Sequence, residues 1–305
     1  MIDVCLLGCG GMMPLPDRKL TSLLVRIKGK MMLIDCGEGT QIPIGLCGWG
    51  FVSIDTILIT HYHADHIAGL PGLLLTMGNS GRTDPVTIAG PAGLFDVIKA
   101  LTVIAPVLPF DLKIAELPDN VAEGFNIGEA MIHSLPVEHS VPCLAYSIYL
   151  KRPGLFDPAK AAHFRVPKAI WRRLQNGDTI TDGGVTYTPS MVLGEPRKGL
   201  KLGYCTDARP SGDLAAFFQD SDLLILEGMY CENEKITQAT EKKHMLFAEA
   251  AALAKNSHAR ELWLTHYSPE IQDPEPCMEP VKQIFSNSHA GRDLMKKTLR
   301  FEAEE

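Results

Sequence analysis

The chain has 305 residues, of which 46% are apolar and 21% charged, enough for a large core in one domain or in two packed halves. No run of eighteen apolar residues occurs, which excludes a membrane-spanning helix, and the N-terminus lacks the basic start of a signal peptide. The net charge of −7 should repel nucleic acid, so a nucleic-acid function requires a local basic patch.

The eight cysteines are scattered along the chain and form no CxxC pair. This spacing does not fit a zinc ribbon. In a chain of this length without a secretion signal, it also argues against disulfides and favours a cytoplasmic protein.

Short apolar and β-branched runs predict strands through the first half of the chain, and helical patterns become frequent later. The predicted strands span residues 3–7, 23–27, 31–35, 56–60, 86–89, 112–117, 130–137, 144–150, 202–205, 222–227 and 261–265. The predicted helices span residues 69–77, 94–103, 212–220 and 243–256. This order is typical of sheets covered by helices, an α/β sandwich.

Residues 151–173 interrupt this pattern with a segment rich in proline and aromatic residues, in which Asp157 is the one acidic residue. We therefore expect a single domain over residues 1–305 with an inserted arm at residues 151–180. Basic side chains on such an arm could neutralise the phosphates of an RNA backbone, although most charge runs are only solvated surfaces. The basic residues are Lys151, Arg152, Lys160, Arg165, Lys168, Arg172 and Arg173.

The stretch HYHADH at residues 61–66 is the strongest chemical signal, because it follows an apolar run and places His61, His63, Asp65 and His66 within six positions. Imidazole and carboxylate are the groups that zinc and manganese prefer. One ion rarely takes four ligands from so short a segment, so the pattern indicates two ions.

Further ligands must then come from other strand ends. His139, Asp207 and His266 each follow an apolar run, and the carboxylate of Asp207 could bridge two ions through its two oxygens. The first glycine-rich loop leads to Arg18, where backbone donors and a cation could hold a phosphate; a plain turn is the alternative.

These motifs resemble the metallo-β-lactamase superfamily, whose signature is His-x-His-x-Asp-His, and within it the ribonuclease Z family. The resemblance covers nearly the whole chain. The matching segments are DCGEGTQ at 35–41, THYHADHIAGLPGLL at 60–74, EPRKGLKLGYCTDAR at 195–209 and KKHMLFAEAAALAKNSHARELWLTHYS at 242–268.

The resemblance implies a four-layer αβ/βα sandwich with two zinc ions per subunit, or manganese in their place. His61, His63 and His139 would hold one ion, and Asp65, His66 and His266 the other, with Asp207 bridging the two.

It further implies removal of the 3′ trailer from precursor tRNA by hydrolysis that leaves a 3′-hydroxyl. Asp65 would accept a proton from the attacking water. His244, paired with Glu227, would protonate the leaving oxygen. His244 falls at the start of a predicted helix, whose dipole would disfavour the imidazolium. The family also implies a homodimer in which the arm of one subunit serves the site of the other.

Two departures from the family pattern affect substrate positioning. The arm lacks the usual Gly-Pro pair, and Leu226-Glu227-Gly228-Met229 replaces a His-Glu-Ala-Thr stretch. Two alternatives therefore stand beside tRNA processing. One is a binuclear phosphodiesterase or other hydrolase of the same fold that acts on small esters. The other is an RNA-binding protein without turnover, which the presence of all candidate ligands disfavours.

Overall fold

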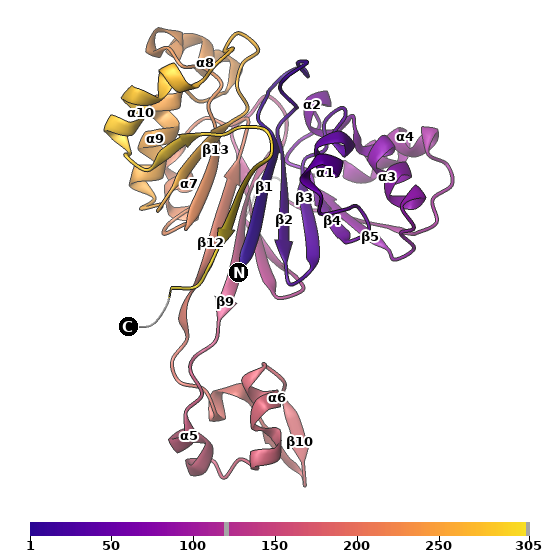
Figure 1. The fold of residues 1–305 in the computed structure, drawn as a ribbon, viewed down its shortest axis with the longest axis vertical. Coiled ribbons are helices and arrows are strands. Elements are labelled where there is room, and N and C mark those ends of the chain that lie inside the picture. The colour runs from indigo at the N-terminus through magenta and orange to yellow at the C-terminus, as the bar shows by residue number, and fades with distance from the viewer. Residues whose placement is uncertain (119–121, 303–305) are drawn as a thin grey trace.

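The computed structural model of the chain describes residues 1–118 and 122–302. Two mixed β-sheets pack face to face, and helices cover the outer face of each sheet (Figure 1). The predicted four-layer αβ/βα sandwich is therefore confirmed. Within these described ranges, no helix is long and apolar enough to cross a membrane.

Each sheet has seven strands in the described part of the chain. The first sheet contains, in spatial order, β16 (Met295–Leu299), β1 (Ile2–Gly8), β2 (Ser22–Ile27), β3 (Lys30–Ile34), β4 (Ile54–Leu58), β5 (Val86–Gly90) and β6 (Leu112–Glu116). The second contains β15 (Ser288–Ala290), β14 (Leu262–Thr265), β13 (Leu223–Glu227), β12 (Arg197–Cys205), β9 (Cys143–Arg152), β8 (Ala130–Val137) and β7 (Glu123–Ile127).

The helices fall into two sets, one beside each sheet (Figure 1). The set beside the first sheet is α1 (Gln41–Cys47), α2 (Ala64–Ile67), α3 (Leu70–Asn79), α4 (Leu94–Leu101) and the 3-10 turn η1 (Thr102–Ile104). The set beside the second sheet is α7 (Gly212–Phe217), η4 (Asn233–Lys235), α8 (Ile236–Lys242), α9 (Phe247–Asn256), η5 (Glu275–Cys277) and α10 (Met278–Ile284).

The strands of the first sheet are apolar on both faces because both faces are covered. In β1, Val4 and Leu6 belong to the core between the two sheets, whereas Cys5 and Leu7 belong to the core beneath the helices. Successive side chains of a strand point to opposite faces, so one apolar run supplies two cores. This explains why these segments read as continuous apolar runs rather than as alternating patterns.

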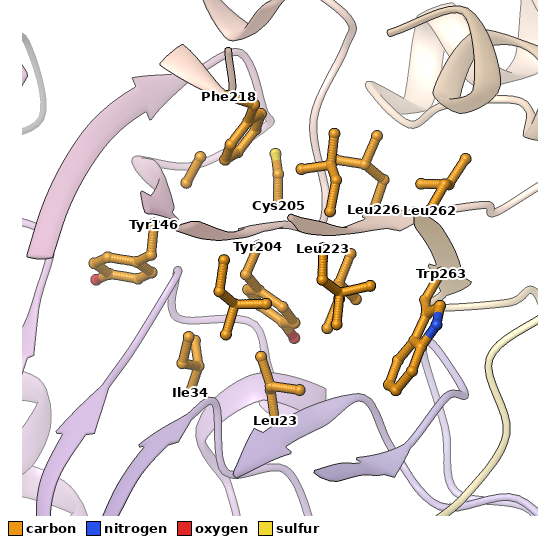
Figure 2. Close-up of a cluster of buried hydrophobic side chains, with 14 of the residues drawn as sticks. Leu23, Ile34, Tyr146, Tyr204, Cys205, Phe218, Leu223, Leu226, Leu262 and Trp263 are labelled. Atoms are coloured by element: carbon orange, nitrogen blue, oxygen red, sulfur yellow. The ribbon is translucent and has the colours of Figure 1, made fainter. Parts of the chain in front are cut away.

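Figure 2 shows how the second sheet meets its neighbours. Tyr204 and Trp263 lie on the face toward Leu23 and Ile34 of the first sheet, and Phe218 lies on the opposite face. All five side chains are buried almost completely. Large aromatic side chains thus fill the space between the sheets and fix their separation.

Several strands end at one edge of the sandwich. In the second sheet, β12, β13 and β14 run parallel to one another, and β3 runs parallel to β4 in the first. The backbone N–H of Leu144 donates to the carbonyl of Thr60 at 3.0 Å, which joins the end of β4 to the start of β9. The loops that follow these strands therefore gather at the same edge.

The segment between β9 and β12 leaves the sandwich at the opposite edge (Figure 1). We call residues 153–196 the inserted arm. It contains α5 (Pro158–His163), η2 (Lys168–Ile170), α6 (Trp171–Gln175), β10 (Ile180–Asp182), β11 (Val185–Tyr187) and η3 (Pro189–Met191). The arm extends beyond the predicted end at residue 180 because Val192 and Leu193 complete a small core with Val166 and Leu174.

Some elements escaped prediction. The short helices α1, α2, α8 and α10, the edge strands β7, β15 and β16, and the elements of the arm have too few residues for a clear period. The predicted helix 243–256 begins instead at Phe247, so His244 does not lie at a helix start. The expected dipole effect on His244 is therefore wrong in its premise.

The expectation that disulfides are absent is also wrong. Cys231 and Cys277 form a disulfide that joins the loop after β13 to η5, and the other six cysteines are free and buried. Spacing along the sequence could not reveal this pair, because the two residues are 46 positions apart and meet only through the packing of two loops.

Denatured protein purified without reductant should show six reactive thiols, and eight after reduction. The double substitution Cys231→Ser and Cys277→Ser should lower the free energy of unfolding by about 2–4 kcal/mol, because the unfolded chain loses a cross-link that closes a long loop. Thiol titration and denaturant unfolding measure the two effects. Eight thiols in the unreduced sample would contradict the disulfide.

Candidate metal centre

The seven predicted metal ligands lie together where the strands end. His61 and His63 follow β4, and His63 caps the one-turn helix α2, which carries Asp65 and His66. His139, Asp207 and His266 follow β8, β12 and β14 in the second sheet. The structure thus brings residues separated by up to two hundred positions to one site between the sheets.

The first group consists of three histidines around one oxygen of Asp207. The Nδ1 atom of His63 lies 3.0 Å from His61 Nε2 and 3.3 Å from His139 Nε2. Asp207 Oδ2 lies 3.8 Å from His61 Nε2 and 3.7 Å from His139 Nε2. All four potential ligand atoms lie within 4.8 Å of one another, which suits one cation.

The second group faces the other oxygen of the same carboxylate. Asp207 Oδ1 lies 3.2 Å from His66 Nε2 and 3.1 Å from His266 Nε2. Asp65 Oδ2 lies 3.5 Å and 3.4 Å from the same two nitrogens. Because Asp207 presents one oxygen to each group, the clusters suit a binuclear centre with a shared carboxylate.

Hydrogen bonds outside the centre turn nitrogen lone pairs toward it. Thr60 Oγ1 donates its only proton to Asp35 and must accept from His61 Nδ1 at 3.0 Å, which leaves His61 Nε2 unprotonated. His139 Nδ1 donates to the carbonyl of Lys243 at 3.3 Å, and His66 Nδ1 contacts Asp35 at 2.8 Å. Such outer contacts orient ligands in metal sites.

The buried acceptors of the centre require positive charge. Asp207 Oδ1 is buried and has no hydrogen-bond partner in the described chain. Burial lowers the pKa of His61 well below its ordinary value and that of His139 to about 4, so both rings are neutral at pH 7. Neutral nitrogens and carboxylate oxygens at such distances repel one another unless a cation lies between them, so these residues fit divalent metal ions.

Backbone conformation also marks the site. Asp35, Asp207 and His266 adopt positive φ angles of 63°, 52° and 56°. Residues other than glycine rarely occupy this left-handed region, and such strain is concentrated at functional sites. Each of the three follows the end of a strand, where the turn redirects the side chain into the cleft.

The first glycine-rich loop supports the second group from above. A Cβ atom on Gly11 would lie 2.7 Å from His266 Cε1, so only glycine lets the loop approach this ring. The backbone N–H of Met12 donates to Asp65 Oδ2 at 2.7 Å. The loop therefore orients a candidate ligand, a role different from the phosphate cradle expected of it.

His244 and Glu227 lie beside the centre. His244 Nδ1 lies 2.9 Å from Glu227 Oε2 and 3.9 Å from Asp207 Oδ2. Glu227 is completely buried, and its other oxygen accepts from the backbone N–H of Ala208 at 2.6 Å. Burial lowers the pKa of His244, but the Glu227 carboxylate outweighs it and raises this pKa to about 9. His244 is therefore protonated at neutral pH.

Comparison with known proteins establishes the family. Residues 31–267 match the beta-lactamase superfamily domain. A ribonuclease Z of Clostridium acetobutylicum is 51% identical, with 99% of each chain covered. A ribonuclease Z of Lachnoclostridium phytofermentans is 53% identical, with 100% of each chain covered. The chain belongs to the ribonuclease Z family. The predicted family and enzyme class, a metal-dependent hydrolase, are confirmed.

A solved ribonuclease Z structure agrees with the fold. The short form of human tRNase Z superposes with a TM-score of 0.71 at 23% identity, covering 98% of this chain and 100% of that one. At this identity the likeness concerns the fold alone.

Asp35 is the functional residue that sequence reasoning missed. It is completely buried, accepts from the backbone N–H of Thr60 at 2.8 Å and contacts His66. The signal was present, because Asp35 ends an apolar run as the predicted ligands do. It was overlooked because nothing in the sequence places it next to HYHADH.

The other predicted substrate contacts lie outside the centre. Arg18 is buried beneath the glycine-rich loop, where its Nη2 donates to the carbonyl of Gln272 at 2.7 Å and its Nη1 has no partner among the described residues. Lys151 and Arg152 lie at the end of β9. The remaining basic residues lie on the arm: Lys160, Arg165, Lys168, Arg172 and Arg173.

Asp35→Asn should weaken metal binding by about 10- to 100-fold, because His66 loses the carboxylate that orients its ring and raises its basicity. Asparagine tolerates the left-handed backbone and has nearly the same shape. Calorimetric titration of metal-free protein with Zn²⁺ measures the effect. The matched control is Asp55→Asn on β4, which should bind as the unmodified chain does; equal affinity in both variants would refute the role of Asp35.

Proposed function

We propose that this ribonuclease Z removes the 3′ trailer from precursor tRNA by hydrolysing one phosphodiester bond, with two zinc ions per subunit, and leaves a 3′-hydroxyl. The observation that carries this proposal is the convergence of seven ligand side chains around the two oxygens of Asp207. Imidazole and carboxylate ligands suit zinc, and manganese accepts the same set.

When bound, two cations supply positive charge that activates water and stabilises a phosphate under in-line attack. His61, His63 and His139 would hold one of them, and Asp65, His66 and His266 the other. The side chains around them exclude bulk water, since His61, His66 and His266 are each at most 1% exposed. A dry site strengthens electrostatic stabilisation of the reacting phosphate.

Asp65 is the proposed acceptor of the proton from the attacking water. Its carboxylate is held by the backbone of Met12 and stands at the more open side of the second group, with 12% of its side chain exposed. Burial raises its pKa, but hydrogen bonds to His266 and His66 outweigh this and hold the pKa well below its usual range. So acidic a carboxylate is a weak base, and binding a cation is its first role.

His244 is the proposed donor of a proton to the leaving ribose oxygen. Its ring stacks near His266, with 5.8 Å between centroids, and Glu227 keeps it protonated. A protonated imidazole that is 13% exposed beside the centre can reach the departing oxygen without being a ligand itself.

The activity is tested by incubating the protein with a 3′-extended precursor tRNA, with and without a chelator, and sizing the products. We expect a single cut near the 3′ end, its loss with chelator and its return with added Zn²⁺. Elemental analysis of the purified protein measures the native metal. Cleavage that continues unchanged after complete removal of metal would refute the proposal.

His244→Ala should lower kcat on precursor tRNA by about 100-fold or more while zinc content stays unchanged. The protonated form is the active one, so activity should fall as the pH rises through the pKa. Bound cations add positive charge nearby, which places this alkaline limit no higher than about 9. Glu227→Gln should move the limit to lower pH, because the carboxylate that raises the pKa is gone. An unmoved limit would contradict the pairing.

The arm is proposed to bind the body of the tRNA. Arg165, Lys168 and Arg172 are exposed, as phosphate contacts must be. Lys160, by contrast, donates to the carbonyl of Leu193 at 3.0 Å and holds the arm together. Within the site itself, the unpartnered Nη1 of Arg18 supports the proposed phosphate contact there.

The position of the arm supports a homodimer. Strand β9 has 10 residues, which span about 30 Å, and the arm begins at the end of β9 that is remote from the metal centre. An arm so placed cannot clamp RNA next to its own centre. We infer that it serves the centre of a second subunit. Exposed Ile42 and Leu46 on α1 offer an apolar surface for such a contact.

Substituting Arg165→Ala and Arg172→Ala together should raise KM for precursor tRNA and reduce the salt dependence of binding by about one unit of log–log slope per contact. Hydrolysis of bis(p-nitrophenyl) phosphate, which needs no arm, should stay unchanged. The matched control is Lys99→Ala with Lys255→Ala, two exposed lysines elsewhere. Unaltered binding of tRNA by the arm variant would refute the assignment.

Mixing subunits tests the dimer. An arm variant and a His63→Ala variant, each defective alone, should together regain cleavage, because the intact arm of the second serves the intact centre of the first. Light scattering should give the mass of two chains. A monomer, or mixed subunits with no regained activity, would overturn the shared arrangement.

A further inference from the structure

The segment that carries His244 is held by its backbone as well as by its ring. Helix α8 ends in a left-handed residue, Lys243, with a φ of 59°. The N–H groups of Lys243 and His244 donate back to Thr240 and Ala239 at 3.2 Å and 2.8 Å, the pattern of a Schellman cap. Helix α9 begins only at Phe247, so residues 244–246 form a short link between two helices.

Arg209 and Glu249 hold this link from outside. Arg209 Nη1 donates to the carbonyl of His244 and, at 2.8 Å, to Glu249 Oε2, while Arg209 Nη2 donates to Glu249 Oε1. Glu249 Oε2 also accepts from the backbone N–H of Leu246 at 2.9 Å. One ion pair thereby fixes both ends of a three-residue link.

The pair is anchored to the metal centre on its other side. Arg209 lies two residues after Asp207, and its backbone N–H donates to the carbonyl of Glu138, the neighbour of His139, at 3.0 Å. The two side chains are 15% and 21% exposed, so the contact is shielded from water. A two-pronged guanidinium–carboxylate contact resists rotation better than a single hydrogen bond.

We propose that Arg209 and Glu249 are positioning residues that hold the backbone of His244 at a fixed distance from the metal centre. Glu227 orients the ring, and the Arg209–Glu249 pair orients the backbone from which the ring projects. This inference rests on the proposed role of His244 as proton donor. Neither member of the pair is assigned a contact with substrate.

The test is a double-substitution cycle measured as single-turnover cleavage of a 3′-extended precursor tRNA by zinc-loaded protein. Arg209→Met should lower the rate by about 10- to 100-fold, because a small displacement of the proton donor is costly. In the His244→Ala background, the same substitution should cause almost no further loss. Residues that act as one unit give such non-additive effects.

A second variant and a control guard against a failure of folding. Glu249→Gln removes the counter-ion of Arg209 but keeps an acceptor for Leu246, and it should also be non-additive with His244→Ala. The control is Arg26→Met, which removes another arginine paired with a carboxylate, that of Asp3 on the adjacent strand, and should leave the rate unchanged.

Amide hydrogen exchange gives a readout without metal or substrate. In chelator-treated protein, Arg209→Met should speed exchange at least about tenfold in peptides covering residues 244–247, whose hydrogen bonds the pair maintains. Peptides from β1 should exchange as in the unmodified chain.

The outcomes separate the two ideas. An equal loss from Arg209→Met in both backgrounds, or a rise in KM with a lower salt slope, would mean that Arg209 contacts RNA or acts elsewhere; this overturns the inference and leaves the proposed function standing. Full activity of His244→Ala would overturn both.

Discussion

The arrangement of the whole molecule serves one electrostatic requirement. Seven acceptor side chains must point into one buried volume although they repel one another in the absence of positive charge. The two sheets meet this requirement by bringing several strand ends to one edge and by fixing each ring from behind. Thr60 and Asp35 act behind His61 and His66, and Lys243 behind His139. The acceptors therefore stay in place because their outer partners are rigid.

The two halves are related in topology, and the relation explains where carboxylates lie. Each sheet combines three antiparallel pairings with three parallel ones, in the same order from its antiparallel edge. Asp35 follows β3 and Asp207 follows β12, the fourth strand of each sheet in that order, and both have positive φ. The Thr-His-Tyr echo follows β4 and β14, which are not equivalent strands. That echo therefore reflects the chemistry of the site rather than the symmetry of the halves.

Sequence reasoning succeeded where chemistry is local and failed where packing decides. The HYHADH cluster and the strand-end residues identify a metal centre because too many ligand types follow apolar runs. The family resemblance then supplied the fold and the grouping. Asp35, the Cys231–Cys277 disulfide and the true start of α9 depend on which loops meet, and no local pattern records that. His244 illustrates the cost, since its helix was misplaced and its pKa depends on Glu227, seventeen positions away.

Recognition and chemistry lie at opposite ends of one strand pair, and this separation has a mechanical reason. Strands β9 and β12 pair from Tyr146 and Tyr204 near the centre to Arg152 and Arg197 at the base of the arm. The ladder is continuous except for a bulge between Arg197 and Leu200, so any bending of the arm is concentrated at its base. The arm also has its own small core. It can therefore tilt as a unit to follow RNA while the bonds that hold Asp207 and His244 in place stay undisturbed.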